Sequence, residues 1–325
     1  MLVYSLIKRT VMESIGEYKL DSRLYENAVV ALDNFANTGP LSAHTNEQAG
    51  ILNDVFNDFL CNFLNKTRDV VYFNGLDEKL KSLRIKKMPL LFSILLGVQG
   101  YYNISTHEIK VSLPISDCIY HELFHAFSSF KVDGEMYGSG FWLYNKHGDI
   151  GLMLNEGYTD LLAFRYFCNS ISYGKEANIA QKLEFMVGKQ RMEEMYGSNN
   201  LLGLVQFLSS YSSFDYAVKF LMILDKFSVH KSICPKDIKI INDVSNYLVE
   251  LYLNYLLTEY KLGKIDISVL TERLEEFKSH FSDYIFNSDW LKSYYECSSE
   301  YEDITNKLSK DYFQKTMKNR PYMHS

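Results

Sequence analysis

The segment HELFH, from His121 to His125, has the residue types and the spacing of a metal site with a built-in base. Residues four apart lie on one face of an α-helix, so both imidazoles can reach one metal ion. Glu122 lies beside the first histidine and can take a proton from a water molecule held at the metal. The segment therefore predicts a helix that presents two nitrogen ligands and one carboxylate to a common point.

A third ligand is expected from the segment NEGYTD, in which Glu156 follows His125 by 31 residues and begins a second helical pattern. Two histidines and a carboxylate leave one tetrahedral position of a zinc ion open for water or substrate. Asp160 lies one helical turn after Glu156 and can accept the free ring N–H of a ligating histidine, which fixes its tautomer. The connection between the two segments is rich in glycine, which predicts a loop or hairpin that brings the helices together.

The simpler interpretation is a helix that carries two histidines without a metal, since the pattern is short. Two observations favour the metal site. One is the acidic second segment, and the other is a set of apolar residues with helical character around the first segment. This set comprises Ile115, Cys118, Ile119, Phe124 and Phe127.

In these segments, and over the stretch from near Gly100 to near Phe167, the chain resembles the gluzincin metallopeptidases of the thermolysin-like clan. The small, minimal gluzincins look more similar than the large secreted enzymes. The resemblance implies a zinc-dependent peptidase that binds one Zn²⁺ per chain and takes peptide or protein as its substrate. The implied roles are zinc ligand for His121, His125 and Glu156, general base for Glu122, and hydrogen-bond partner of a ligand for Asp160.

A β-hairpin is predicted just before the first motif, over residues 100–112. Ile109 and Val111 alternate with Lys110 and Ser112, which is the period of a strand. In gluzincins, a strand at this place forms the rim of the cleft and holds an extended peptide by backbone hydrogen bonds. The resemblance implies that Ile109, Lys110 and Val111 form this substrate-binding edge. An ordinary hairpin of a small sheet is the alternative.

Peptide hydrolysis needs a hydrogen-bond donor for the oxyanion of its tetrahedral intermediate. Gluzincins supply a tyrosine or histidine from outside the two motifs, and no motif fixes that residue here. The candidates are His147, Tyr144, Tyr173, Tyr211 and His230. Of these, we expect His147 and Tyr173 to be catalytic residues. The chain has 25 tyrosines, so any one of them is more often a core or surface residue. His107 has no second histidine four residues on and is expected to be a hydrogen-bonded histidine.

The surrounding sequence predicts an α+β fold that is predominantly helical. It has a small mixed sheet, the helices of the two motifs, and extra helices at both ends. Apolar residues at helical spacing predict helices over residues 46–64 and 237–260, the second ending at Gly263, and a further helix through Leu270, Leu274, Phe277 and Phe281. Residues 68–73 could form a short strand.

Three parts of the chain are expected. Residues 1–95 would form a mainly helical segment, residues 96–170 the zinc-binding catalytic core, and residues 171–325 a helical subdomain. Ser116 or Asp117 is a candidate N-cap for the first motif helix, and Asn155 for the second.

Composition limits the classes of function. The chain has 325 residues, 47% of them hydrophobic and 23% charged, with a net charge of −6 and no basic tract, so nucleic acid is not an expected partner. Its five cysteines are widely spaced, which favours free thiols in a reducing compartment. The N-terminus lacks the order of a secretory signal, and the longest apolar run is too short to span a membrane. We therefore expect a cytoplasmic protein without a membrane partner, and the sequence predicts no oligomeric state.

Two other functions stay open at this point. A zinc-stabilised module could bind a partner without cutting it and would use the same ligands. Glu122 argues against this function, because a purely structural site closes with four protein ligands and has no use for a nearby base. The other alternative is a helical interaction protein in which the motif is accidental.

Overall fold

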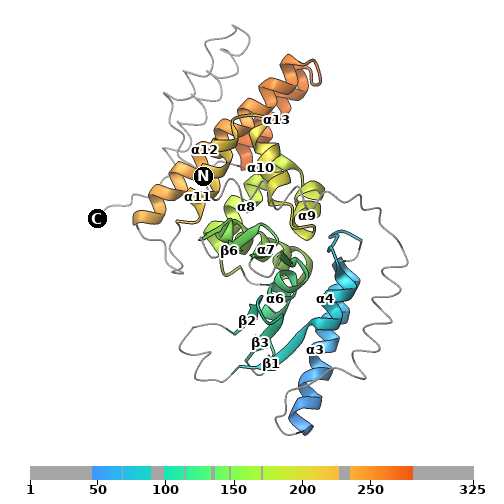
Figure 1. Ribbon diagram of the computed structural model, residues 1–325. Coiled ribbons are helices and arrows are strands. Elements are labelled where there is room, and N and C mark those ends of the chain that lie inside the picture. Colours follow the sequence, from blue (N-terminus) through green and yellow to red (C-terminus); the bar gives the residue numbers. More distant parts are fainter. Residues whose placement is uncertain are drawn as a thin grey trace. The chain divides into compact units, whose positions relative to one another are not determined.

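The computed structural model describes the chain over residues 46–67, 69–88, 99–112, 115–132, 136–145, 148–169, 171–226 and 235–280. Over these ranges the chain forms ten helices and seven strands, so the fold is α+β and predominantly helical, as predicted (Figure 1). The structure divides into two compact units, of which the first ends at Phe207 and the second begins at Leu208. The predicted three-part division stays a prediction. None of the described helices is long and apolar enough to cross a membrane.

A small mixed sheet precedes the first motif. Its strands are β1 (Arg84–Lys87), β2 (Gly100–Asn103) and β3 (Glu108–Val111), in the order β1-β3-β2. β2 and β3 form the predicted antiparallel hairpin, with Tyr102 opposite Ile109, and β1 pairs with β3 in parallel. The sequence did not predict β1. The predicted strand at 68–73 is wrong where the chain is described, because residues 69–73 form a turn and an irregular segment.

The strand order corrects the predicted substrate-binding edge. β3 carries Ile109, Lys110 and Val111, and it lies between β1 and β2, so its backbone groups are used on both sides. Ile109 and Val111 are also buried. Strand addition needs a free edge. Within the described part of the sheet, the free edge next to the hairpin turn belongs to β2, and the prediction for β3 is wrong.

The glycine-rich connection forms a four-stranded antiparallel sheet, where a loop or a single hairpin was predicted. Its strands, in spatial order, are β4 (Ser129–Val132), β5 (Met136–Ser139), β6 (Trp142–Asn145) and β7 (Gly148–Ile150). At two positions of this sheet, glycine is required for steric or conformational reasons. A Cβ on Gly138 would lie 2.2 Å from the Phe130 ring, and Gly140 has a φ of 53° at the β5–β6 turn.

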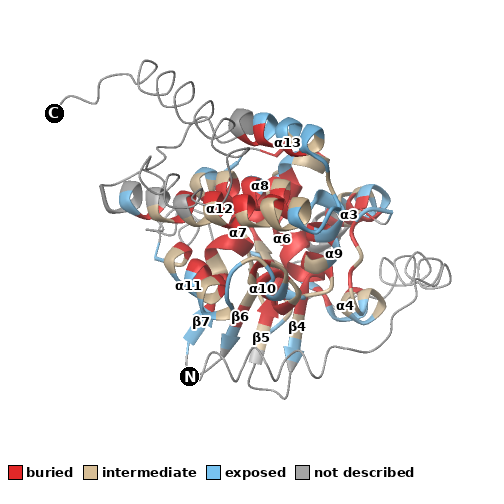
Figure 2. Ribbon diagram, turned by 90° about the horizontal axis from the view of Figure 1, so that it is seen from above, coloured by how far each residue is buried: buried red, intermediate tan, exposed pale blue. Residues whose placement is uncertain are grey.

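The helices of the first unit surround the two motifs. They are α3 (Asn46–Thr67), α4 (Leu76–Ser82), α6 (Cys118–Phe127), α7 (Leu152–Phe167), α8 (Gly174–Val187) and α9 (Lys189–Gly197), followed by α10 (Leu201–Ser209), which runs across the boundary between the units. Figure 2 colours most of α6, α7 and α8 as buried. The core is aromatic: the ring centroid of Phe63 lies 4.8 Å from Phe124, 5.4 Å from Phe127 and 5.6 Å from Phe167. This packing fixes α6 against α3 and α7.

The predicted cap of the second motif helix is wrong, whereas Asp117 does occupy the N-cap position of the first. α7 begins at Leu152, directly after Gly151 with its φ of 81°, so Asn155 lies inside the helix and does not cap it. Its side chain is used elsewhere, as described below. Asp117 stands before α6, but its side chain makes no capping hydrogen bond.

The second unit contains α11 (Phe214–Leu224), α12 (Pro235–Lys261) and α13 (Ile267–His280). Leu270, Leu274 and Phe277 are buried on one face of α13, as their spacing predicted, and Phe281 lies outside the described residues. Gly263 has a φ of 68° just after α12, and its amide donates to the Tyr260 carbonyl. This left-handed residue ends the helix, in agreement with the prediction.

Candidate metal centre

The helix α6 presents the first motif on a buried face. Every residue from Ile119 to Phe127 is buried, because α3, α7 and the mixed sheet cover the helix. His121 and His125 lie one turn apart, and their ring centroids are 4.6 Å from each other. The helical period thus places both imidazoles at one point, as the sequence predicted.

The helix α7 brings Glu156 to the same point. The Nε2 atoms of His121 and His125 lie 2.9 Å apart, and Glu156 Oε2 lies 3.3 Å from the first and 3.4 Å from the second. A triangle with these sides has a circumscribed radius of about 1.9 Å. Zinc binds histidine nitrogen and carboxylate oxygen at about 2.0–2.2 Å. The three predicted ligands therefore converge, and the group can hold a metal ion.

Asp160 makes the predicted contact with a ligand. Its Oδ1 lies 2.7 Å from His121 Nδ1 and accepts the ring proton. This leaves the Nε2 lone pair free to point at the metal position. Its other oxygen, Oδ2, accepts the backbone amides of Ser172 and Tyr173, both at 2.6 Å. One carboxylate thus holds a ligand and the segment before α8.

The second histidine has partners that the sequence did not predict. His125 Nδ1 lies 3.3 Å from Ser139 Oγ and 3.2 Å from Asn155 Nδ2. Ser139 Oγ donates to the His125 carbonyl, and Asn155 Oδ1 accepts the backbone amide of Phe141. With its proton on Nδ1, His125 donates to a lone pair of Ser139 Oγ and keeps Nε2 free for a metal. The Asn155 amide group, itself a donor, then only contacts the ring. In the sequence, the only indication that Asn155 belongs to the site is its position directly before Glu156.

The charges of the site call for a cation. Burial lowers the pKa of His121, but its contacts with Asp160 and Glu156 outweigh burial and raise this pKa well above the ordinary value. Burial alone would raise the pKa of Glu156, yet the two imidazoles lower it far below the usual range. Positive charge on His121 thus balances the carboxylates, a role that a divalent ion can take over.

Glu122 is buried beside the three ligands. Burial raises its pKa, the charges of His121 and His125 lower it, and the charge of Glu156 raises it. The backbone amide of Tyr102 in β2 also donates a hydrogen bond to this carboxylate and lowers the pKa. Glu122 therefore interacts electrostatically with all three ligands and with the edge strand.

Tyr173 is the one catalytic candidate of the described residues that lies against the ligands. Its ring stacks on His121, with centroids 5.9 Å apart and planes 21° from parallel. The charge of Glu156 is the largest of the effects that raise its pKa, followed by burial and by Glu122. The phenol therefore keeps its proton and can donate a hydrogen bond at the site.

The remaining candidates are placed as follows. His147 and His230 lie outside the described residues, so both stay predictions. Tyr144 is exposed on β6, with its ring 6.0 Å from Trp142. Tyr211 belongs to the second unit, where its ring contacts Tyr255. His107 is hydrogen-bonded through both ring nitrogens, as expected.

A close helix contact supports the position of Glu156. The next residue, Gly157, packs against α8, and a Cβ there would lie 2.3 Å from the backbone carbon of Glu176. Glycine lets the two helices approach at this point. Thr159 Oγ1 also lies 2.7 Å from the hydroxyl of Tyr196 in α9. α7 is thereby fixed by both following helices.

Comparison with known proteins identifies no relative of this chain. No family model matches the chain, and neither the curated proteins nor the solved structures contain a significant match. The site is therefore interpreted from its own residues.

Proposed function

We propose that this protein is a zinc-dependent peptidase that hydrolyses peptide or protein substrates, as its resemblance to minimal gluzincins implies. One observation carries the proposal: a buried carboxylate, Glu122, lies beside three converging metal ligands. Within the described residues the ligand group has three members, which suits a site with an open position better than a closed structural site.

The donor set fits zinc. Two imidazole nitrogens and one carboxylate oxygen are among its usual ligands, and the distances between them suit its bond lengths. When bound, zinc would polarise the scissile carbonyl and make water more acidic. His121, His125 and Glu156 would hold it, and Asp160 would orient His121.

The residues of the chain have separate tasks in the proposed reaction. Glu122 takes a proton from the attacking water, whose oxygen forms a bond to the scissile carbonyl carbon. When the carbon–nitrogen bond breaks, the same proton passes to the leaving amine. Tyr173 stays protonated and is suited to donate a hydrogen bond to the oxyanion that develops.

The edge strand β2 is suited to hold the substrate backbone. Tyr102 in β2 places an amide at Glu122, so this side of the strand faces the base. An extended peptide that adds to β2 would lie along the site. This assignment replaces β3 as the substrate-binding strand.

Metal analysis is the first test. The purified chain should hold one zinc ion, and His125→Ala should lose it because two ligands are too few for tight binding. A wild-type chain that takes up no zinc at neutral pH would contradict the proposal.

The second test separates a peptidase from a binding protein with the same ligands. Glu122→Gln should keep the zinc and lose cleavage of a mixed peptide library by a factor of at least about 10³, because the base is removed. The control is Glu194→Gln, an exposed carboxylate on α9, which should cleave as the wild type does. Zinc binding without chelator-sensitive cleavage in the wild type would favour the binding protein.

A further inference from the structure

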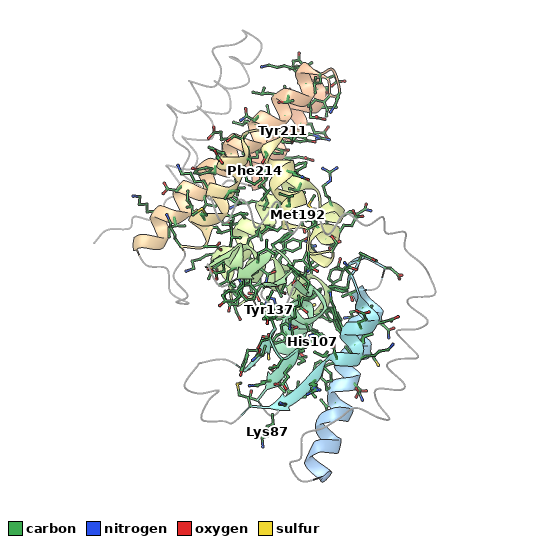
Figure 3. All side chains as sticks on the ribbon, viewed as in Figure 1. Lys87, His107, Tyr137, Met192, Tyr211 and Phe214 are labelled. Carbon is green, nitrogen blue, oxygen red and sulfur yellow. The ribbon has the colours of Figure 1, made fainter. Side chains whose placement is uncertain are left out.

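The turn between β2 and β3 contains a histidine that the proposed reaction does not use. His107 has a φ of 53°, a left-handed conformation that is uncommon outside glycine. Its Nε2 lies 2.9 Å from the Lys79 carbonyl, and its Nδ1 lies 2.6 Å from the Tyr102 hydroxyl. Figure 3 labels His107 beside this hairpin and α4. Non-glycine residues persist in this conformation where their surroundings hold them, which is common near functional sites.

The hydrogen bonds of His107 have defined directions. Burial lowers its pKa, so the ring is neutral and carries one proton. The Lys79 carbonyl can only accept, so the proton lies on Nε2. Nδ1 is then an acceptor for the Tyr102 hydroxyl. The histidine therefore links two elements by hydrogen bonds, because one partner lies in α4 and the other in β2.

The same contacts lead to the end of the motif helix. The Tyr102 hydroxyl lies 2.9 Å from Ser129 Oγ, and the single proton of this serine can go either to Tyr102 or to the Ala126 carbonyl, 2.7 Å away. On the other side, Lys79 Nζ donates to the Phe127 carbonyl at 2.6 Å. Both branches end on the last turn of α6.

Tyr102 thus touches α6 at two places. Its backbone amide donates to the Glu122 carboxylate in the middle of the helix, and its hydroxyl joins the contacts at the end of the helix. An edge strand on its own has one free side and can shift. Two separate contacts through one residue prevent β2 from sliding along α6.

We propose that His107 is a positioning residue, which fixes Tyr102 and so holds the edge strand β2 in register with Glu122. The inference deepens the proposed function, since it rests on Glu122 as base and β2 as the strand that binds the substrate. A substrate backbone added to β2 would then meet the base at a set distance. Misplacement of reacting groups by about 1 Å can lower a rate by about 100-fold.

Amide hydrogen exchange on the full-length, Zn²⁺-loaded chain tests the positioning. Tyr102→Phe removes only the hydroxyl, and His107→Gly removes the ring but tolerates the backbone conformation. Both should accelerate exchange in residues 100–103 by at least about 10-fold, with α6 and α7 unchanged. The control Tyr101→Phe alters the neighbouring tyrosine and should leave exchange unchanged.

The conservative variant His107→Asn should restore slow exchange to within about 3-fold of the wild type. Asparagine tolerates the left-handed conformation, and its amide can bond to Tyr102. The double variant Tyr102→Phe/His107→Gly should accelerate exchange by less than the two single effects combined, because both substitutions remove the contact between Tyr102 and His107. Unchanged exchange in β2, or equal acceleration in α6 and α7, would overturn the inference.

Cleavage tests the function separately. On the library peptide that the wild type cleaves best, the two variants should lower kcat about 10- to 100-fold and change KM less than about 3-fold. Zinc content should stay at the wild-type level. A wild type that cleaves no peptide contradicts the proposed function, whereas exchange still decides whether His107 positions β2. Active variants with unchanged kcat would contradict the inference alone.

Discussion

The two units of the molecule bury different kinds of side chain. Among the described residues, seventeen polar or charged side chains are buried, and Ser245 is the only one of them in the unit that begins at Leu208. The buried face of α13 consists of Leu270, Leu274 and Phe277. The buried face of α6 includes two histidines and a glutamate.

This difference shows where the fold depends on partners for buried polar groups. A buried polar group destabilises the fold unless it finds a partner, and a buried charge does so more strongly. The first unit therefore needs partners at fixed places, such as Asp160 for His121 and Arg165 for two glutamates. The second unit needs apolar residues at helical spacing. Substitutions of polar contacts should therefore affect the two units unequally.

The largest difference is expected from arginine substitutions. Arg165 on α7 forms ion pairs with Glu184 at 2.5 Å and Glu193 at 2.7 Å. Arg165→Met leaves both buried carboxylates without their cation and should lower the free energy of unfolding by about 3 kcal/mol. Arg273→Met in the second unit removes a contact with the Tyr255 hydroxyl and should change it by less than about 0.5 kcal/mol. Denaturant unfolding measures both, and equal losses would refute the comparison.

A glycine substitution should break the close contact of α7 with α8. Gly157→Ala places a Cβ 2.3 Å from backbone atoms, so the helices must separate. We expect a loss of about 2 kcal/mol, as for other overpacked sites, together with weaker metal binding. Gly174→Ala is the matched control, because a Cβ there meets nothing within 4 Å. Thermal unfolding of the two variants checks this; a tolerated Gly157→Ala would show that the contact is loose.

The contact of Asp160 with His121 should govern metal affinity. Asp160→Ala removes the acceptor of the ring proton and the anchor of the Ser172 and Tyr173 amides. Zinc should dissociate about 10- to 100-fold more readily. Competition with a chromophoric chelator measures the affinity, with the exposed Asp149→Ala as control. An unchanged zinc affinity would show that Asp160 does not orient the ligand.

The smallest effect should appear in the pH dependence of stability. Burial lowers the pKa of Lys79 to about 7, below its usual 10.5. Between these values the unfolded chain binds more protons, so the free energy of unfolding should rise with pH. The gain from pH 7 to 9, relative to Lys79→Met, should be about 1 kcal/mol because the side chain is half-buried. Parallel pH profiles of the two proteins would refute a neutral Lys79 in the folded state.

Much of the fold and of the site could be predicted from the helical spacing of residues in the sequence. His121 and His125 at a spacing of four, and Asp160 one turn after Glu156, share helix faces in the structure as predicted. The apolar residues of α13 and the glycine after α12 also have the predicted places. In each case the information lies within about two helical turns, where backbone geometry alone fixes the side-chain directions.

The errors concern contacts between distant segments. β1 pairs with β3 across more than twenty residues, and this pairing turns the expected edge strand into a central one. Asn155 looks like a cap in the sequence, but its side chain reaches Phe141 and His125. The glycine-rich stretch forms four strands because each pairs with a neighbour, and no single strand shows a strong alternation.

The sequence by itself thus determined the ligand set and the helices that carry it, since both depend on local spacing along one helix. Tertiary structure alone decided which strand next to the hairpin turn has a free edge, which groups support His125, and which tyrosine stacks on His121. The physical reason is that hydrogen bonds and ring contacts between remote segments depend on how whole elements pack. That packing is a sum of many contacts, of which no short segment of the chain contains more than one side.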